Sequence, residues 1–167
     1  MSVRPARADD IDGLLAFDMT VVVRSATDWA RALDQCELGL RQLLVAVVDG
    51  VVAGFGQAHY LEAHADGGPA GYYLTGVTVL PDFRRQGLAL ELTVPRLEWI
   101  RDRADAAWCF INAQNDASIR LHEKLGFIEM HRASSIQGVV FGGKGGVLLE
   151  RRLGNAGARS EVLWRVE

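Results

Sequence analysis

The feature that most constrains the fold is a strand that leads through a short turn into a helix. YYLTGVTVL is a run of β-branched and aromatic residues that ends before Pro81, as strands do. The turn PDFRRQG follows, and apolar residues then recur at helical spacing from Gly87 to about Arg103. Pro95 lies within this helix, so we expect a lost backbone hydrogen bond and a kink or a short break there.

Two cations stand at the start of this helix, Arg84 and Arg85. A helix N-terminus already carries partial positive charge, so acidic residues are the usual choice there. Free backbone N–H groups at such a junction bind phosphate when side chains leave room, as Gly87 and Ala89 do. The pattern predicts a site for an anion as highly charged as a pyrophosphate. The alternative is that both arginines are ordinary solvated turn residues.

The rest of the chain predicts strands and helices in one α/β domain over residues 1–167. Before the central motif we expect an extended start at Val3–Ala6, a helix from Ile11 to Asp18 capped by Asp9, a second helix from Asp28 to Leu38, a hairpin turn at Asp49-Gly50 and a loop over 64–71. After it we expect a strand at AAWCFINA, a helix at NDASIRLHEKLG closed by Gly126, and strands at FIEMHRAS and GVLLERRL. This order indicates three layers, with a mixed, mostly antiparallel central sheet flanked by helices.

Composition excludes several classes of function. The chain has 18 basic and 21 acidic residues, so it lacks the basic bias of a nucleic-acid binder. Its two cysteines, Cys36 and Cys109, belong to no CxxC or His/Cys cluster, so neither a disulfide framework nor a metal site is predicted. No signal peptide or membrane-length apolar run occurs. We expect a soluble, cytoplasmic protein that binds no metal, nucleic acid or membrane.

Two motifs, in order, resemble those of the GNAT superfamily of N-acetyltransferases. VTVLPDFRRQGLA resembles the acetyl-CoA-binding motif of that family, Arg/Gln-x-x-Gly-x-Gly/Ala, at Arg84, Gly87 and Ala89. NDASIRLHEKLGF resembles the second signature of the family, an Asn-led helix that ends in Lys-x-Gly-Phe. The two motifs cover about residues 75–127, and the flanking elements fit the layout of the family without a motif. The resemblance implies a single acyl-CoA-binding acetyltransferase domain.

The resemblance implies acetyl-CoA as the co-substrate. A splayed pair of parallel strands would hold the pantetheine arm, with backbone groups of Val77 and Val79 pairing to it. Asn115 would hydrogen-bond the cofactor near the thioester, and it also stands where a helix cap belongs, so the two roles are compatible. The expected cofactor-binding residues are Val77, Thr78, Val79, Arg84, Arg85, Gln86, Gly87, Leu88, Ala89 and Asn115.

Acetyl transfer to an amine needs a deprotonated amine, donors for the oxyanion and a proton for the thiolate. The usual oxyanion donor in the family is a backbone N–H, which corresponds here to the region Val77–Val79. Relatives often place a tyrosine acid seven residues after the motif asparagine, where this chain has His122. An imidazole can donate the proton, but a half-buried helix histidine with a structural hydrogen bond is the alternative.

The general base has no single candidate. Many relatives carry a glutamate on the strand before the glycine motif, whereas this strand has no carboxylate. The remaining candidates are His59, Glu62 and His64, or a chain of water molecules, and Asn112 could line the pocket from the next strand.

We therefore predict an acetyl-CoA-dependent N-acetyltransferase in which a primary amine of a small molecule or peptide attacks the thioester directly. The net charge of −3 favours a cationic acceptor. The missing carboxylate and tyrosine suggest an alternative, a catalytically silent acyl-CoA-binding or sensing module. GGKGG suggests a P-loop nucleotide enzyme, although the Ser/Thr and the helix that should follow Lys144 are missing. A homodimer is a habit of the family.

Overall fold

The computed structural model describes residues 1–17 and 23–154. Its elements are β1 (Ser2–Pro5), η1 (Ala8–Asp10), α1 (Ile11–Leu15), α2 (Ala26–Glu37), β2 (Arg41–Val48), β3 (Val51–Leu61), β4 (Gly71–Val79), η2 (Pro81–Phe83), α3 (Leu88–Arg101), β5 (Ala106–Asn112), α4 (Asp116–Lys124), β6 (Ile128–Ala133), β7 (Ser135–Ile136), β8 (Val139–Val140) and β9 (Gly146–Arg152), where η denotes a 3₁₀ helix.

Seven strands of the described chain are hydrogen-bonded in the order β1-β2-β3-β4-β5-β9-β6, and β7 and β8 form a separate two-stranded sheet. The pairings β1–β2, β2–β3, β5–β9 and β6–β9 are antiparallel, and β4–β5 is parallel. The predicted mixed, mostly antiparallel sheet with flanking helices is confirmed.

The chain forms two compact units, which share β3, β4 and α3. The first comprises Met1–His59 and Leu74–Arg96, and the second comprises Tyr60–Tyr73 and the chain from Leu97 onward. Each unit has its own cluster of buried residues.

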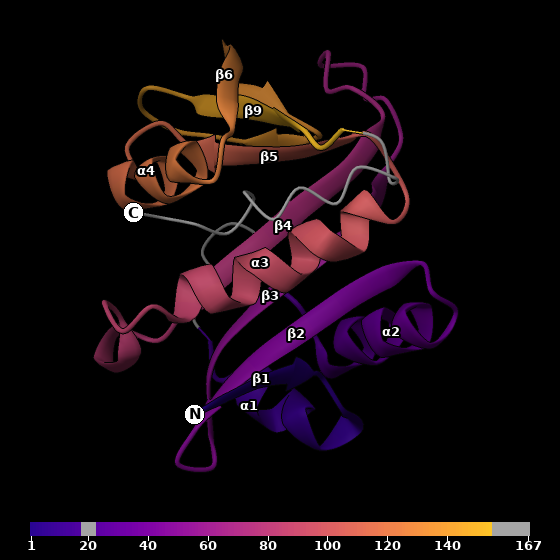
Figure 1. The fold of residues 1–167 in the computed structure, drawn as a ribbon, viewed down its shortest axis with the longest axis vertical. Coiled ribbons are helices and arrows are strands. Elements are labelled where there is room, and N and C mark those ends of the chain that lie inside the picture. The colour runs from indigo at the N-terminus through magenta and orange to yellow at the C-terminus, as the bar shows by residue number, and fades with distance from the viewer. Residues whose placement is uncertain (18–22, 155–167) are drawn as a thin grey trace. The chain divides into compact units, whose positions relative to one another are not determined.

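The first unit has three layers. On one face of its strands, α1 and α2 cover a core of Leu14, Phe17, Trp29, Ala32, Leu43, Val45 and Phe55. On the other face, the first turns of α3 pack Leu88 and Leu92 against Leu44, Ala46 and Ala53. Figure 1 shows α2 beside β2 in this part of the chain. Odd-numbered and even-numbered residues of β2 face opposite layers, as the two-residue period of a strand requires.

The β2–β3 hairpin turns at Asp49 and Gly50, as predicted. Both residues have positive φ, +49° and +78°, as the tight hairpin turn between right-twisted strands requires. Beyond the turn the register shifts by one residue: Val47 pairs with Val52, but Ala46 pairs with Gly54. Ala53 is thus the extra residue of a bulge, and every later residue of β3 changes its partner.

The helices at the N-terminus begin differently from the prediction. Asp9 does not cap the first helix; instead the Asp10 carboxylate accepts a 2.7 Å hydrogen bond from the Arg7 amide and two from the Arg4 guanidinium. The second helix begins earlier than Asp28, because Ser25 is its N-cap and forms a capping box with Asp28. Asp18, the predicted end of the first helix, lies outside the described residues.

The second unit is built on β5, β9 and β6, in which β9 is hydrogen-bonded to β5 on one side and to β6 on the other. All three strands are labelled in Figure 1. Its core contains Tyr73, Ile136 and Leu148. Gly126, with φ +87°, follows the end of α4 as predicted. The short strands β7 and β8 were not predicted, because two residues each are too few to show a pattern.

The helix α3 is continuous through Pro95, so the predicted short break is wrong, and the alternative of a kink stays a prediction. Side chains supplement the backbone bonds around the proline. Thr93 Oγ1 donates to the Ala89 carbonyl at 2.7 Å, and Arg96 Nε donates to the Leu92 carbonyl at 2.7 Å. Within the described chain, no helix has both the length and the apolar character needed to cross a membrane.

Candidate active site

The predicted phosphate loop lies in the first unit, between β4 and α3. Arg84 Nε donates a 3.1 Å hydrogen bond to the Val79 carbonyl, which ties the loop to the end of the strand. The backbone is left-handed at Arg85, with φ +62°, and at Gly87, with φ +82°. Residues other than glycine rarely adopt this backbone conformation, so contacts with neighbouring residues must stabilise the loop at Arg85.

The N-terminus of α3 is open at this loop. The first helical hydrogen bond joins the Glu91 amide to the Gly87 carbonyl at 3.1 Å, so the amides of Leu88, Ala89 and Leu90 precede the hydrogen-bonded ladder. A Cβ on Gly87 would meet no atom of the described residues within 4 Å. Leu88 is only 1% exposed, so its side chain anchors the start of the helix in the core. The arrangement can bind an anion by backbone groups.

Val77, Thr78 and Val79 form the end of β4. The side chains of Val77 and Val79 pack against the core under α3. The parallel pairing with β5 uses Tyr72 and Tyr73, and within the described register the last three residues of β4 have no partner in β5. Their backbone groups on that edge can therefore pair with another extended chain or ligand.

Asn115 and His122 lie in the second unit, on α4. Asn115 is the N-cap, and its Oδ1 accepts a 3.2 Å hydrogen bond from the Ser118 amide, so the capping role is confirmed. This bond uses the carbonyl oxygen and leaves the side-chain NH₂ for another acceptor. Asn112 Oδ1 similarly accepts from the Gln114 amide at 2.9 Å.

His122 is buried, with 3% of its surface exposed. Its Nδ1 lies 2.7 Å from the Ser118 carbonyl, and since a carbonyl only accepts, Nδ1 carries the hydrogen. The ring also packs edge-on against Phe127, with 5.3 Å between centroids. These contacts are those that the structural interpretation of His122 predicts, and they leave the proton-donor role as a prediction.

The three candidates for the base have different settings. His59 is half-buried on β3, in the first unit. Glu62 and His64 are exposed residues of the loop after β3, in the second unit, and His64 Nδ1 lies 3.1 Å from an Asp66 oxygen. Asp66 ties this loop to β7–β8, because it accepts hydrogen bonds from Ser135 and from the Gly138 amide. The pKa of Asp66 is well below its usual range, mainly because of the Gly138 amide.

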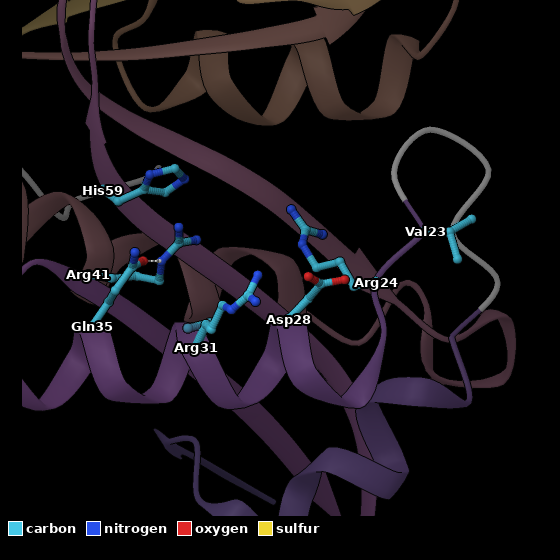
Figure 2. Close-up of a pocket in the computed structure, with 8 residues that line it drawn as sticks. Val23, Arg24, Asp28, Arg31, Gln35, Arg41 and His59 are labelled. Atoms are coloured by element: carbon cyan, nitrogen blue, oxygen red, sulfur yellow. Dashed lines mark hydrogen bonds between the residues drawn. The ribbon is translucent and has the colours of Figure 1, made fainter.

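Sequence reasoning missed a pocket in the first unit that is lined by arginines. It has a volume of about 350 Å³ and lies beside α2, with His59 on its wall. Figure 2 shows the guanidinium groups of Arg24, Arg31 and Arg41 directed toward the same hollow. The signal in the sequence was weak, because Arg24 precedes the helix, Arg31 is on it and Arg41 is on a strand.

Two further predictions concern ligands. FGGKGG lies between β8 and β9, so Lys144 leads into a strand. A phosphate-binding P-loop leads into a helix whose N-terminus faces the phosphates, so the P-loop interpretation is wrong. Among the described residues, no group of three or more His, Cys, Asp or Glu side chains is placed to hold a metal ion.

The sequence profile described as Acetyltransferase (GNAT) family matches residues 10–127, a span that includes the loop, β4 and α4. The chain belongs to the GNAT family of acetyltransferases.

Among curated relatives, the chain is 43% identical over 63 residues to the N-terminal acetyltransferase B complex catalytic subunit NAA20 of Arabidopsis thaliana, which is 36% of each protein. It is 30% identical over 91 residues to aminoglycoside N(6')-acetyltransferase type 1 of Salmonella typhimurium, which is 53% of this chain and 63% of that protein. The match thus spans less than two thirds of either relative.

Solved structures of the family share the fold over nearly their whole length. A ribosomal-protein-alanine N-acetyltransferase from Brucella melitensis superposes with a TM-score of 0.73 at 22% identity, covering 92% of this chain and 100% of that one. A phosphinothricin acetyltransferase from Sinorhizobium meliloti, solved in complex with AcCoA, gives 0.73 at 17% identity, covering 98% and 95%. At these identities the likeness establishes the fold.

Proposed function

We propose that this chain is an N-acetyltransferase that moves an acetyl group from acetyl-CoA to a primary amine by direct attack. The observation that carries the proposal is the open N-terminus of α3, where left-handed Gly87 leaves space beside the first amides of the helix in a chain of the GNAT family. Amides and cations gathered at one helix start favour a ligand that carries several negative charges.

The residues present fit the pyrophosphate of acetyl-CoA. The amides of Leu88 and Ala89 would donate to phosphate oxygens, and the exposed guanidinium groups of Arg84 and Arg85 would add charge-assisted hydrogen bonds. Space is available at Gly87, where a side chain would otherwise intrude. The backbone of Val77 and Val79 would pair with the pantetheine arm as a neighbouring strand does.

The thioester supplies an activated acyl group, and the reaction exchanges its C–S bond for a C–N bond. The attacking amine must lose a proton, and the departing thiolate must gain one. A backbone N–H in the region Val77–Val79 would stabilise the oxyanion. We assign the thiolate proton to His122, where an imidazolium would serve as the acid.

Of the three candidates for the base, His59 is favoured by its setting. It is half-buried and lines a pocket, whereas Glu62 and His64 are exposed and His64 is held near Asp66. A base shielded from bulk water is easier to hold at a defined position beside an amine. The acceptor amine would then reach the thioester from the side of α2.

One observation favours a second candidate, a silent acyl-CoA-binding module. β4 has the sequence GYYLTGVTV and carries no carboxylate. Such a module would bind acetyl-CoA as the enzyme does but would leave amines unmodified.

Two measurements on the wild-type chain test the proposal. Calorimetry with acetyl-CoA is expected to show one saturable site, and CoA release is expected to rise when suitable primary amines are added. Binding without amine-dependent CoA release would favour the silent module. Failure to bind acetyl-CoA would overturn both functions.

A further inference from the structure

The arginine-lined pocket of the first unit has the size of a small-ligand site. Its volume of about 350 Å³ falls within the range of pockets that hold small molecules. Its wall combines the polar face of α2 with the start of β2 and the end of β3, where Arg41 pairs with His59 across the strands. The pocket lies wholly within one compact unit.

Positive charge dominates this wall. Among the described residues, three guanidinium groups, those of Arg24, Arg31 and Arg41, line the pocket together with one carboxylate, Asp28. Asp28 is engaged by the helix cap, where it accepts hydrogen bonds from the Ser25 amide at 2.8 Å and the Ser25 hydroxyl at 3.0 Å. Among residues 1–17 and 23–154, none of the three arginines forms an ion pair.

Neutral groups hold two of these arginines in place without cancelling their charge. Arg41 donates to Gln57 Oε1 at 2.6 Å and to Gln35 Oε1 at 2.7 Å. These bonds use two of the five N–H groups that a guanidinium offers. The Arg24 guanidinium lies over the Trp29 ring, 5.3 Å from its centroid. The cations are therefore positioned while N–H groups stay available for a ligand.

Bringing these charges together has a cost in the free chain. Burial lowers the pKa of Arg24, and burial together with the charge of Arg24 lowers the pKa of Arg41. Both effects disfavour the charged form, and the attraction of an anion bound between the arginines would offset them. Arginine is also the side chain whose planar fork matches carboxylate and phosphate oxygens.

We propose that this pocket binds an anionic group, a carboxylate or a phosphate, of the amine that the enzyme acetylates. The inference rests on the proposed function, and it assigns the acceptor class that the family does not specify: amines that carry a negative charge. Arg31 and Arg41 contact the anion, and His59, on the same wall, lies beside the amine end of the acceptor.

The same field assists the chemistry. An amine must be deprotonated to attack, and nearby positive charge disfavours the ammonium form. The anion's own charge would favour the ammonium form, and pairing it with the arginines offsets that effect, so the positive charge that remains on the wall still disfavours protonation of the amine. A cationic acceptor without an anionic group would meet repulsion instead.

Matched pairs of acceptors test the proposal by CoA release. We would compare β-alanine with its carboxamide, and O-phosphoethanolamine with ethanolamine, so that each pair differs in the anionic group. In one of the two pairs, we expect kcat/KM to be at least about tenfold higher for the member that carries the anionic group. The pair that shows this difference identifies whether the pocket prefers a carboxylate or a phosphate. Equal values within both pairs on working enzyme would overturn the inference.

Substitution of Arg31 links the preference to this pocket. Arg31 is exposed and mid-helix, so Arg31→Gln is expected to fold normally. It should reduce the preference for the charged acceptor about tenfold through KM, with the Kd of acetyl-CoA unchanged. Arg152→Gln, which removes the same charge from a side chain that is 74% exposed, is the control and should behave as wild type. An unchanged preference in Arg31→Gln would overturn the assignment to this pocket.

Direct binding separates failure of the inference from failure of the proposed function. Calorimetric titration with acetate and with inorganic phosphate should show binding that Arg31→Gln weakens and that the control Arg152→Gln leaves in place. Such binding without any affinity for acetyl-CoA would refute the proposed function and keep the anion pocket. If no amine of the panel is a substrate, anion binding still decides. Weaker anion binding by Arg31→Gln than by wild type would support the inference, and equal binding by the two proteins would overturn it.

Discussion

Replacing Gly87 by alanine tests whether the space at the start of α3 belongs to a ligand. Gly87 has φ +82°, and an added Cβ would meet no protein atom within 4 Å. The substitution therefore introduces backbone strain but no clash within the protein. Left-handed backbone costs an L-residue about 1–2 kcal/mol, and each kcal/mol lowers Tm by about 2–4 °C in a chain of this size. We expect Gly87→Ala to melt roughly 2–8 °C lower than wild type.

Gly50 provides a matched control in the same compact unit. Its φ is +78°, and a Cβ there would also meet nothing within 4 Å. Gly50→Ala should thus lose about the same stability as Gly87→Ala. The two positions differ in that only Gly87 adjoins the amides proposed to hold the pyrophosphate.

Affinity for acetyl-CoA distinguishes the two variants. The added methyl of Gly87→Ala would occupy phosphate space, so its Kd should rise at least about tenfold, equivalent to about 1.4 kcal/mol. Gly50→Ala should bind as wild type. Calorimetry on both proteins, well below their melting temperatures, gives the comparison. If Gly87→Ala is destabilised to the same extent as Gly50→Ala yet binds acetyl-CoA normally, the loop does not hold the pyrophosphate.

Three further predictions concern single side chains. Arg85→Ala should weaken acetyl-CoA binding about tenfold in calorimetry, because it removes a charge-assisted contact. If both Arg85→Ala and Arg84→Ala bind acetyl-CoA with wild-type affinity, the two loop arginines are not part of the cofactor site. His122→Phe should lower kcat by about 10²–10⁴ if the imidazole is the acid, with acetyl-CoA affinity kept; a lower Tm with wild-type turnover per folded molecule would show a structural role. The pKa of Asp66 is lower in the folded than in the unfolded chain. The ionised carboxylate therefore stabilises the fold fully above the unfolded pKa of about 3.9, and this stabilisation is lost as pH falls through the folded pKa. Asp66→Asn should therefore speed amide exchange at Gly138 at neutral pH, and unchanged exchange would show that the carboxylate does not hold the loop.

Much of the fold was predictable because local signals agreed with the tertiary structure. The Asp49-Gly50 turn specified a hairpin, and Gly126 marked the end of α4. The loop before α3 was predictable for the same reason: its glycine is needed by backbone geometry, and its arginines stand next to it in sequence. The caps at Ser25 and Asp10 were missed because several Ser and Asp residues nearby could have served.

The bulge at Ala53 could not be predicted, and it decides what surrounds the arginine pocket. A regular two-residue turn at Asp49-Gly50 would pair Arg41 with Ala58. The extra residue shifts the register so that Arg41 pairs with His59. A shift of one residue moves side chains to the opposite face of a strand, so an unbulged β3 would turn His59 away from α2. Gly54 in the run VVAGF is an ambiguous signal, because a glycine inside a strand marks either a bulge or a close backbone approach, and a Cβ at Gly54 would lie 3.0 Å from the Thr78 carbonyl oxygen.

The net charge of the whole chain and the local charge of its pocket predict opposite classes of acceptor amine. The net charge of −3 favours a cationic amine, but it sums groups spread over the entire surface. Salt screens exposed charges beyond a Debye length of about 8 Å, so a ligand in the pocket interacts mainly with the groups that line it. Two unit charges 4 Å apart interact by about 4 kcal/mol near a protein surface. Of the residues that the structure describes, three arginines line this wall against one carboxylate, which caps a helix. The local groups therefore outweigh the net charge, and they favour an acceptor that brings its own anion.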